Sequence, residues 1–307
     1  MVEKFIEYMA VEKRYSQHTL ISYEKDLKDF QGFLMKTEGQ DNLLKVEKKM
    51  VRNFMMELSE QGIAKRSINR KLSTLRSFYR YLLKIGEIAV SPMEGVQTLK
   101  FNAEKQIPFS EEEMRRLQEV SLYKGEDYFL EKLVIETLYQ TGMRKSELCG
   151  LLMENVDFSK NELRVKGKGN KVRMIPISKE LTSELMSYLA YREPLEGFEG
   201  YFFISKRGKK LNPRWIYEVV HRYFSMVTAK EKKSPHILRH SFATHILNRG
   251  AEISKVKAIL GHASLSSTQV YTDANIEQLK KIFNQAHPRA GKNEREKEED
   301  GNGSENK

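Results

Sequence analysis

Apolar residues recur at helical spacing through residues 1–85. The clearest stripe, in steps of three and four, follows a polar helix-start segment at Ser16 to Thr19 and comprises Leu20, Tyr23, Leu27, Phe30 and Leu34. Residues 5–9, 51–58 and 68–82 show the same spacing, and Ser67 is placed to cap the last of these segments. The pattern predicts a small bundle of four helices, formed by a domain that spans residues 1–86.

Residues 87–109 show no sustained period, and Pro92, Gly95 and Pro108 would interrupt a helix there, so this segment is expected to be a linker. The helical pattern resumes at Ser110, which has capping-box spacing to Glu113. A long apolar helix then ends at Gly142. A second domain is therefore expected over residues 110–287.

A β-hairpin interrupts the second helical domain. Residues 162–166 and 171–177 alternate polar and apolar positions around Gly167-Lys168-Gly169-Asn170, which is typical of two antiparallel strands joined by a tight turn. Further helices are expected near Glu180, Pro213, His236, Ile253 and Ser264. The predicted fold class is mainly α with a small β-sheet.

The composition limits which cellular compartment and which class of binding partner are expected. The net charge is +11, and a basic folded region favours a polyanion such as DNA or RNA. A single cysteine excludes a disulfide framework and a multi-cysteine metal site, and no run is apolar enough to cross a bilayer. The protein is expected in the cytoplasm without membrane contact. Residues 288–307 hold almost no apolar side chain and are expected to form a disordered charged tail.

Basic residues gather around the last helix of the first domain. This run allows two interpretations, a solvated helix face or a face that contacts phosphates. The residues are Lys65, Arg66, Arg70, Lys71, Arg76 and Arg80.

The second domain places polar residues beside helix ends and turns. They are Arg144, Lys168, His236, Arg239, His262 and Tyr271. An arginine at the start of a helix is unfavourable to the helix dipole, so Arg144 indicates an anionic ligand. The three imidazoles of His236, His240 and His245 raise the alternative of a zinc site, but no accompanying carboxylate or cysteine motif supports it. No metal is expected, and His245 or His240 is expected to be a structural histidine.

Four ordered motifs give the chain its resemblance to the tyrosine recombinase (phage integrase) family, which extends to about Ala290. Residues 141–148 (TGMRKSEL) resemble the first arginine box, and residues 167–171 (GKGNK) resemble the β-hairpin lysine motif. Residues 236–240 (HILRH) are similar to the His-x-x-Arg box, and residues 260–262 (LGH) with Tyr271 to the terminal box. The resemblance implies an N-terminal SAM-like core-binding domain and a C-terminal recombinase catalytic domain.

The resemblance also implies a role for each residue of the set. Tyr271 would be the nucleophile, assisted by Arg144, Lys168, His236, Arg239 and His262. This chemistry suits the residues, because two arginines can hold the non-bridging oxygens of a phosphodiester while an imidazole accepts the tyrosine proton. Lys168 suits protonation of the leaving 5′ oxygen, and Glu147 is placed to orient a basic neighbour. A phosphotyrosine intermediate needs no ATP, metal or other cofactor.

Within the family the chain is most similar to Xer recombinases, on the ending of residues 283–290 (FNQAHPRA) and on the compact first domain. The likeness implies a nucleoid-associated enzyme that acts on double-stranded DNA with a palindromic core site, as a homo-tetramer or a hetero-tetramer with a second recombinase. Chromosome dimer resolution is the expected role. An integrase or excisionase of a mobile element, a type IB topoisomerase-like enzyme and a non-enzymatic DNA-binding protein remain alternatives.

The last apolar stripe bears on assembly. Ile276, Leu279, Ile282 and Phe283 form a short helical face soon after Tyr271. A helix with this face would dock either on a neighbouring subunit or on its own domain.

Overall fold

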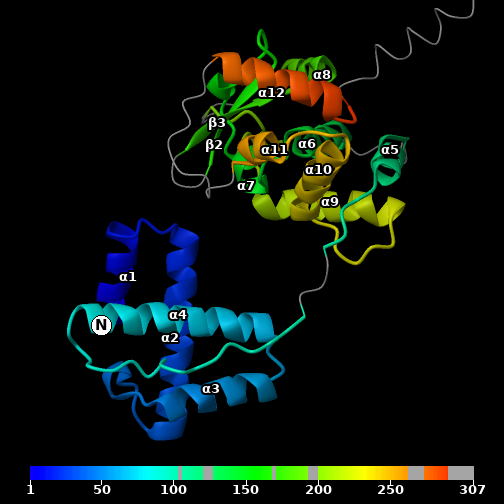
Figure 1. Cartoon of the computed structure of the whole chain (residues 1–307). Helices are drawn as coiled ribbons and strands as arrows, with labels where there is room; N and C mark the ends of the chain where they lie inside the picture. The colour runs from blue at the N-terminus through cyan, green and yellow to red at the C-terminus, as the bar shows by residue number, and fades with distance from the viewer. Residues whose placement is uncertain (103–105, 120–126, 168–170, 193–199, 262–272, 290–307) are drawn as a thin grey trace, which may run out of the picture. The chain divides into compact units, whose positions relative to one another are not determined.

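The computed structural model divides the chain into two units, Met1–Glu104 and Lys105–Lys307, each with its own hydrophobic core (Figure 1). It describes residues 1–102, 106–119, 127–167, 171–192, 200–261 and 273–289. Lys168, His262, Tyr271, the helix expected near Ser264 and the tail from residue 290 lie outside the described residues. Among the described helices, none combines the length and the apolar character that a membrane span requires.

The first unit is built from the four helices that the apolar spacing predicts. They are α1 (Val2–Val11), α2 (Gln17–Glu38), α3 (Lys48–Glu60) and α4 (Lys65–Lys84), with a short 3₁₀ turn at Leu43–Lys45. Both α1 and α3 pack against α2, and α4 packs against α2 and α3. Aromatic rings close the core, as where the centroids of Phe30 and Phe54 lie 5.0 Å apart.

The predicted helix starts are partly correct. Ser16 is the N-cap of α2, although its hydroxyl bonds the Thr19 hydroxyl rather than a backbone N–H. The capping prediction for Ser67 is wrong, because α4 begins earlier and its N-cap is Ala64. The Ala64 carbonyl accepts hydrogen bonds from the backbone N–H groups of Ser67 and Ile68, so Ser67 already lies in the first turn.

Both ends of the expected linker, residues 87–109, contribute to cores. Met93 and Val96 are buried in the first core, and the Val96 carbonyl accepts a hydrogen bond from Nη2 of Arg76 at 2.8 Å. Phe109 is fully buried in the second core and stacks on Phe224. These described residues of the predicted linker therefore belong to the two cores.

The second unit consists of helices around a small sheet. Its helices are α5 (Glu111–Glu119), α6 (Tyr128–Thr141), α7 (Lys145–Cys149), α8 (Lys179–Tyr191), α9 (Pro213–Val227), α10 (Pro235–Asn248), α11 (Ile253–Leu260) and α12 (Asp273–Ala286). The strands β1 (Val156–Asp157), β2 (Glu162–Lys166) and β3 (Val172–Pro176) form an antiparallel sheet in chain order. The β2–β3 pairing confirms the predicted hairpin, and the fold class is confirmed with it.

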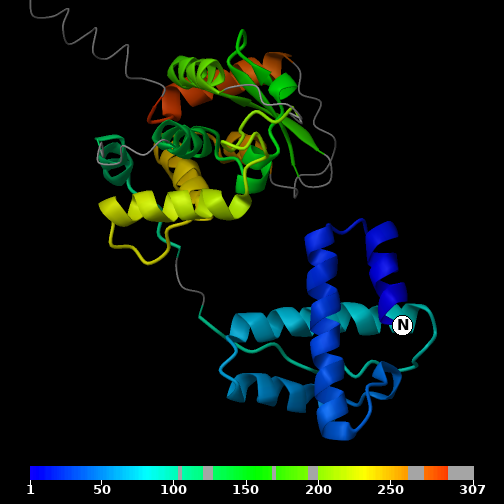
Figure 2. The ribbon, with the colours of Figure 1, turned by 180° about the vertical axis from the view of Figure 1, so that it is seen from behind.

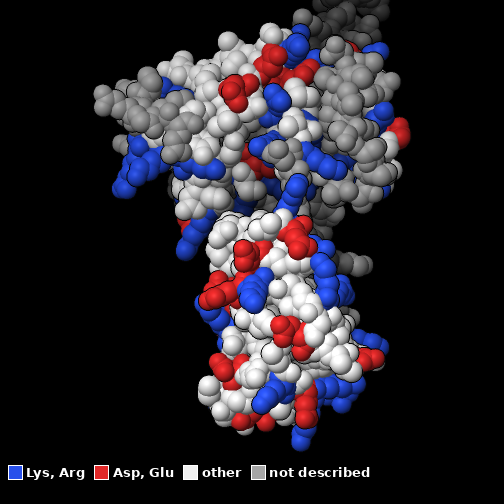
Figure 3. Space-filling view, turned by 90° about the vertical axis from the view of Figure 1, so that its left-hand side faces the viewer, with Lys and Arg blue, Asp and Glu red and all other residues white. Residues whose placement is uncertain are grey.

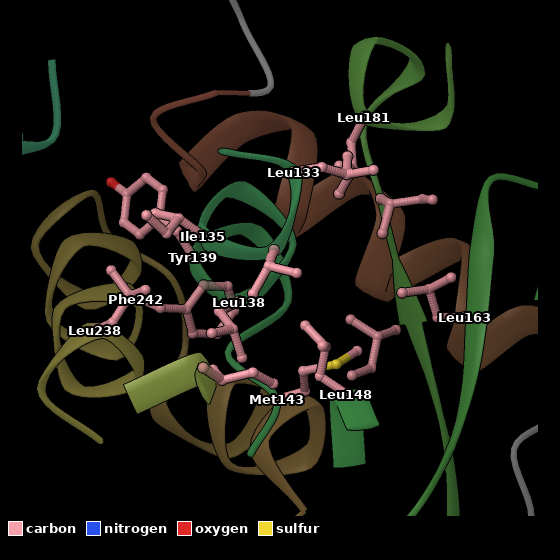
Figure 4. Close-up of a cluster of buried hydrophobic side chains, with 14 of the residues drawn as sticks. Leu133, Ile135, Leu138, Tyr139, Met143, Leu148, Leu163, Leu181, Leu238 and Phe242 are labelled. Carbon is pink, nitrogen blue, oxygen red and sulfur yellow. The ribbon is translucent and has the colours of Figure 1, made fainter. Parts of the chain in front are cut away.

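The core of this unit forms around α6. In Figure 1 and Figure 2, α12 lies on one side of α6 and α9 on the other. Figure 4 shows Leu138 and Tyr139 of α6 beside Phe242 of α10, within one cluster that extends to the sheet and α8. A Cβ on Gly142 would lie 2.5 Å from Cδ1 of Phe242, and Gly142 has φ +58°. Only glycine therefore fits where α6 ends against α10.

Helix α12 packs on its own domain, against β3 and α10. Leu279 and Phe283 are buried there, and Nζ of Lys280 lies 2.7 Å from Oε1 of the buried Glu162. Docking of this face on a neighbouring subunit is therefore not how the isolated chain folds. These apolar side chains fill the protein's own core instead.

The folded part of the chain also extends beyond its expected end at residue 287. Nε of Arg289 donates to Oε1 of Glu136 at 3.0 Å, and Nη2 donates to the Met114 carbonyl at 3.1 Å. Arg289, assigned to the tail from its sequence context, is thus held by α5 and α6. Burying an arginine in this way requires such partners, and the surrounding sequence gave no sign of them.

Candidate active site

Arg144 lies at the exposed edge of a cluster of charged groups. It is the N-cap of α7, and its backbone N–H donates to Oε2 of Glu147 at 2.7 Å. Nη1 of the same arginine donates to Oε1 of Glu147 at 2.7 Å, while 40% of the Arg144 side chain stays exposed. The carboxylate of Glu147 thus fixes this guanidinium at the surface, within reach of a ligand.

Glu147 also binds a second arginine from the sheet. Arg173 of β3 donates from Nη1 to Oε1 of Glu147 at 3.0 Å and from Nη2 to Oε2 at 2.7 Å. Burial raises the pKa of Glu147, but hydrogen bonds and charges from Arg173 and Arg144 outweigh burial and leave that pKa below its usual value. The carboxylate is therefore ionised at neutral pH, with two cationic partners.

Arg239 of α10 lies buried between two helix ends. Nη1 donates to the carbonyl of Gly142 after α6, and Nη2 donates to the carbonyl of Leu260 at the end of α11, both at 2.6 Å. Both are backbone carbonyls at helix C-termini, where the helix dipole favours a cation. Burial, with smaller contributions from the charges of Arg144 and Arg173, lowers the pKa of Arg239 to about 10. Arg239 still remains charged at neutral pH.

These four groups leave an excess of positive charge. Two guanidinium groups, from Arg144 and Arg173, form ion pairs with the single carboxylate of Glu147, and the third guanidinium, of Arg239, is close enough to feel the charges of all three groups. The guanidinium of Arg239 donates to two backbone carbonyls, which do not cancel its charge. An anion with several oxygens, such as a phosphate group, would complete the balance. The structure thus brings together the two arginines that the sequence singles out.

The histidines of α10 separate into surface and core groups. Ser234 is the N-cap and Pro235 the first residue of α10, as predicted, so His236 lies in the exposed first turn, one turn before Arg239. His240 is also exposed. His245 is buried, and Nε2 faces the Phe109 carbonyl while Nδ1 faces the Tyr139 hydroxyl, each at 2.8 Å.

His245 is therefore a structural histidine, which confirms one of the two candidates for that role. Its Nε2 donates to the carbonyl, and its Nδ1 accepts from the tyrosine. With both ring nitrogens engaged in the core, the three imidazoles do not converge on a zinc ion. Within the described ranges no group of three metal-ligating side chains occurs.

Three predicted site residues, Lys168, His262 and Tyr271, lie outside the described residues, so the structure does not report their side chains. Their flanking positions are described. The backbone N–H of Gly167, at the end of the β2–β3 hairpin, donates to the Lys171 carbonyl at 2.8 Å. Gly261 is the predicted left-handed C-cap of α11, and α12 begins at Asp273.

Family models match both units. The "Phage integrase family" model matches residues 109–278, and the "Phage integrase, N-terminal SAM-like domain" model matches residues 2–86. Together they cover well over half of the chain. The chain belongs to the phage integrase family.

Known relatives refine this membership. The chain is 37% identical to tyrosine recombinase XerC of Chlorobaculum parvum, with 94% of each chain covered. It is 35% identical to XerC of Staphylococcus aureus strain MRSA252, covering 94% of this chain and 97% of that protein. The protein is accordingly a Xer-like site-specific tyrosine recombinase of the phage integrase family.

Solved structures share the fold. XerH recombinase bound to a palindromic difH substrate matches with a TM-score of 0.69 and 21% identity, covering 91% of this chain and 82% of that one. A lambda integrase dimer on a core site matches with a TM-score of 0.67 and 16% identity, covering 88% and 98%. At this level of identity the likeness concerns the fold.

The basic residues of α4 divide into those that pair with carboxylates of α2 and those that remain exposed. Arg70 donates from Nη2 to Oδ1 of the buried Asp26 at 2.8 Å, and the buried Lys71 lies 3.2 Å from the same oxygen. Lys71 also pairs with Asp29, so burial and two carboxylates remove it from the predicted phosphate-contacting set. The Lys71 assignment is corrected to an internal ion pair.

Other residues of that set remain available. Lys65 and Arg66 are exposed, and Arg70 keeps half of its side chain exposed beside Asp26. Arg76 is partly buried against the Val96 carbonyl. In Figure 3, acidic side chains lie among the basic ones on the N-terminal unit, so its charge on the face seen there is mixed.

Arg173 was not among the predicted site residues. The sequence carried a signal for it, because residues 171, 173, 175 and 177 share one face of a strand, and Ile175 and Ile177 make that face apolar. A charged residue on a core-facing position needs a buried partner. The partner, Glu147, is distant in sequence and was found only in the folded chain.

Proposed function

We propose that the protein cuts and rejoins double-stranded DNA at a specific site through a covalent 3′-phosphotyrosine intermediate. The observation that carries this proposal is the excess positive charge around Arg239, where three neighbouring guanidinium groups, of Arg144, Arg173 and Arg239, are accompanied by the one carboxylate of Glu147. A scissile phosphodiester is an anion whose oxygens gain charge in the transition state. Preorganised cationic donors stabilise that charge more than they stabilise the ground state.

Each site residue takes a part in the proposed reaction. Arg144 and Arg239 bind the non-bridging oxygens of the phosphate, and Glu147 orients Arg144. The hydroxyl of Tyr271 attacks phosphorus while His236 accepts its proton, and the bond to the 5′ oxygen breaks.

Two further residues complete the step. Lys168 gives a proton to the leaving 5′ oxygen, and His262 donates another hydrogen bond to the phosphate. Because the phosphotyrosine conserves the phosphodiester energy, the released 5′ hydroxyl of a second duplex can attack it. Rejoining then needs no ATP and no metal.

The cellular role we propose is resolution of chromosome dimers by a nucleoid-associated enzyme in the cytoplasm. Relatives named XerC match 94% of the chain at 35% to 37% identity, which favours this role. Several solved structures of the fold are recombinases on DNA, one of them on a palindromic site. We propose a palindromic core site and a tetramer, formed by one recombinase or by two.

A mobile-element integrase is the second candidate function. The integrase of transposon Tn1549, solved with a circular intermediate DNA, shares the fold with a TM-score of 0.67 at 20% identity. That identity is lower than the identity to the XerC relatives. The Xer role is therefore the one that the comparisons favour.

Trapping on nicked suicide substrates tests the proposed chemistry. The wild-type protein should form a covalent protein–DNA complex that resists denaturation. Tyr271→Phe should bind the same DNA but form no covalent complex, because only the nucleophilic oxygen is lost. Covalent adduct in the phenylalanine variant would place the nucleophile elsewhere, and no adduct in the wild type on any duplex would refute the proposal.

The same assay separates the two roles. Substrates carrying candidate palindromic sites from the chromosomal terminus are compared with substrates carrying element ends. Preferential trapping on terminus sites supports dimer resolution. Preferential trapping on element ends supports integration.

A further inference from the structure

Arg173 uses every nitrogen of its guanidinium on partners from other parts of the fold. Its side chain is 4% exposed. Nη1 and Nη2 form two parallel hydrogen bonds with the carboxylate of Glu147, and Nε donates to the carbonyl of Ile259 at 2.7 Å. A planar fork that meets a carboxylate in this way fixes distance and angle together.

The first of these contacts reaches a catalytic group. Glu147 accepts four hydrogen bonds, two from Arg173 and two from Arg144. Because Glu147 binds both arginines, the position of the Arg173 guanidinium on β3 fixes the position of the Arg144 guanidinium. Without Arg173, the Glu147 carboxylate would keep only partners from its own helix turn, which do not fix it relative to the sheet.

The second set of contacts reaches two backbone segments that lead into the site. A Cβ on Gly167 would lie 3.4 Å from both Nη1 of Arg173 and Oε1 of Glu147, so this backbone packs directly on the ion pair. A Cβ on Gly261 would lie 3.0 Å from Cδ of Arg173. In the sequence, Gly167 and Gly261 immediately precede Lys168 and His262.

We propose that Arg173 is a positioning residue for DNA cleavage, which fixes Arg144 through Glu147 and holds the hairpin end at Gly167 against the end of α11. This inference rests on the proposed cleavage reaction. Arg173 itself is too buried to contact DNA. Its effect is on the rate of the chemical step, because small errors in the position of a catalytic group are costly there.

The test compares Arg173→Lys with the wild type in single-turnover cleavage of a suicide substrate, together with DNA affinity and melting temperature. Lysine keeps the charge but loses the fork. We expect covalent-complex formation to slow by about 100-fold, while the dissociation constant for DNA changes by less than about threefold. Replacing a residue with only a structural role would change both the cleavage rate and the dissociation constant, or neither of them.

Arg222→Lys is the matched control. Arg222 of α9 pairs with the buried Glu131 of α6 in the same domain, and this pair is separate from the Arg173 cluster. Its lysine variant also loses a guanidinium–carboxylate contact. We expect it to cleave at a rate close to that of the wild type.

Arg173→Ala, assayed in parallel, keeps the inference testable if the lysine variant is unstable. Added ethylguanidinium should restore at least about tenfold of the lost rate in this variant, whereas ethylammonium at the same concentration should not. Wild-type cleavage in Arg173→Lys, or equal slowing in Arg222→Lys, would overturn the inference. The absence of cleavage by the wild-type protein would instead count against the proposed function.

Discussion

Arg173 and Arg239 hold the same helix end from two sides. Nε of Arg173 donates to the Ile259 carbonyl at 2.7 Å, and Nη2 of Arg239 donates to the Leu260 carbonyl at 2.6 Å. These carbonyls lack partners within α11 because the helix ends there, and they carry the negative end of its dipole. One arginine comes from the sheet and the other from α10, so the end of α11 joins the two parts of the site.

Replacing Arg144 and Arg239, the two proposed phosphate ligands, with alanine should have different effects on stability. Both variants should cleave about 100-fold to 1,000-fold more slowly, since each lacks a charged donor to the developing phosphate charge. Arg144→Ala should melt close to the wild type, because 40% of its side chain is exposed. Arg239→Ala, in contrast, should melt at a lower temperature than the wild type, because it leaves the carbonyls of Gly142 and Leu260 without a donor.

Single-turnover cleavage and calorimetry measure the two properties separately. Lys145→Ala, a change at the neighbouring residue of α7, serves as the control for a lost positive charge. If both arginine variants cleaved at nearly the wild-type rate, their assignment as phosphate ligands would be wrong.

Arg66 and Lys71 should affect DNA binding differently. Arg66→Met removes an exposed cation, so a phosphate contact there predicts weaker binding and a fall of about 1 in the slope of log affinity against log salt concentration. Lys71→Met should leave the salt slope unchanged but lower stability, because Asp26 and Asp29 lose a buried partner. Salt titrations of half-site binding provide the measurement. Equal salt slopes for the two variants and the wild type would remove α4 from the DNA interface.

Polar replacement of Leu279 or Phe283 should destabilise the isolated protein. Both side chains are buried in the protomer's own core, so Leu279→Ser and Phe283→Ser should each lower the free energy of unfolding by about 2–5 kcal/mol. Met186→Ser, at an exposed position of α8, should change it by less than about 0.5 kcal/mol. Denaturant titration without DNA measures all three. Wild-type stability of the first two variants would instead favour docking of α12 on a neighbour.

The C-terminal end of α12 should make stability depend on pH. Burial lowers the pKa of His287 from 6.5 to about 3, and the backbone N–H of Arg289 donates to its Nδ1, so the folded state holds a neutral ring. The ring binds a proton more readily in the unfolded state. The neutral His287 ring therefore contributes fully to the stability of the folded state above pH 6.5. That contribution falls by about 1.4 kcal/mol per pH unit as the pH drops toward 3.

The variant His287→Phe should flatten this pH dependence. Its ring can occupy the same place beside Phe283, whose ring centroid lies 4.8 Å from that of His287. Unfolding free energies measured between pH 4 and pH 7 give both profiles. Identical slopes for the variant and the wild type would show that other groups, such as the buried His245, account for the acid sensitivity.

Local pattern was enough to predict most elements of the structure. The apolar stripe through Leu27 and Phe30 gave α2, the alternation around Gly167 gave the hairpin, and Gly142 and Gly261 marked the ends of α6 and α11. These features depend on interactions between residues a few positions apart. The pattern could not locate the start of α4, because a capping serine and a serine in the first turn look alike in sequence.

The sequence by itself therefore determined most of the described helices and the hairpin, since each follows from short-range spacing and residue type, and it singled out the residues proposed to carry the chemistry. The tertiary structure alone decided which charges meet. Lys71 and Arg70 occupy the same basic run, yet only Lys71 is buried between Asp26 and Asp29. Arg173 and Glu147 are 26 residues apart and meet only because β3 packs beside α7. Burial makes a charge require a partner, and which partner is available depends on how distant segments pack.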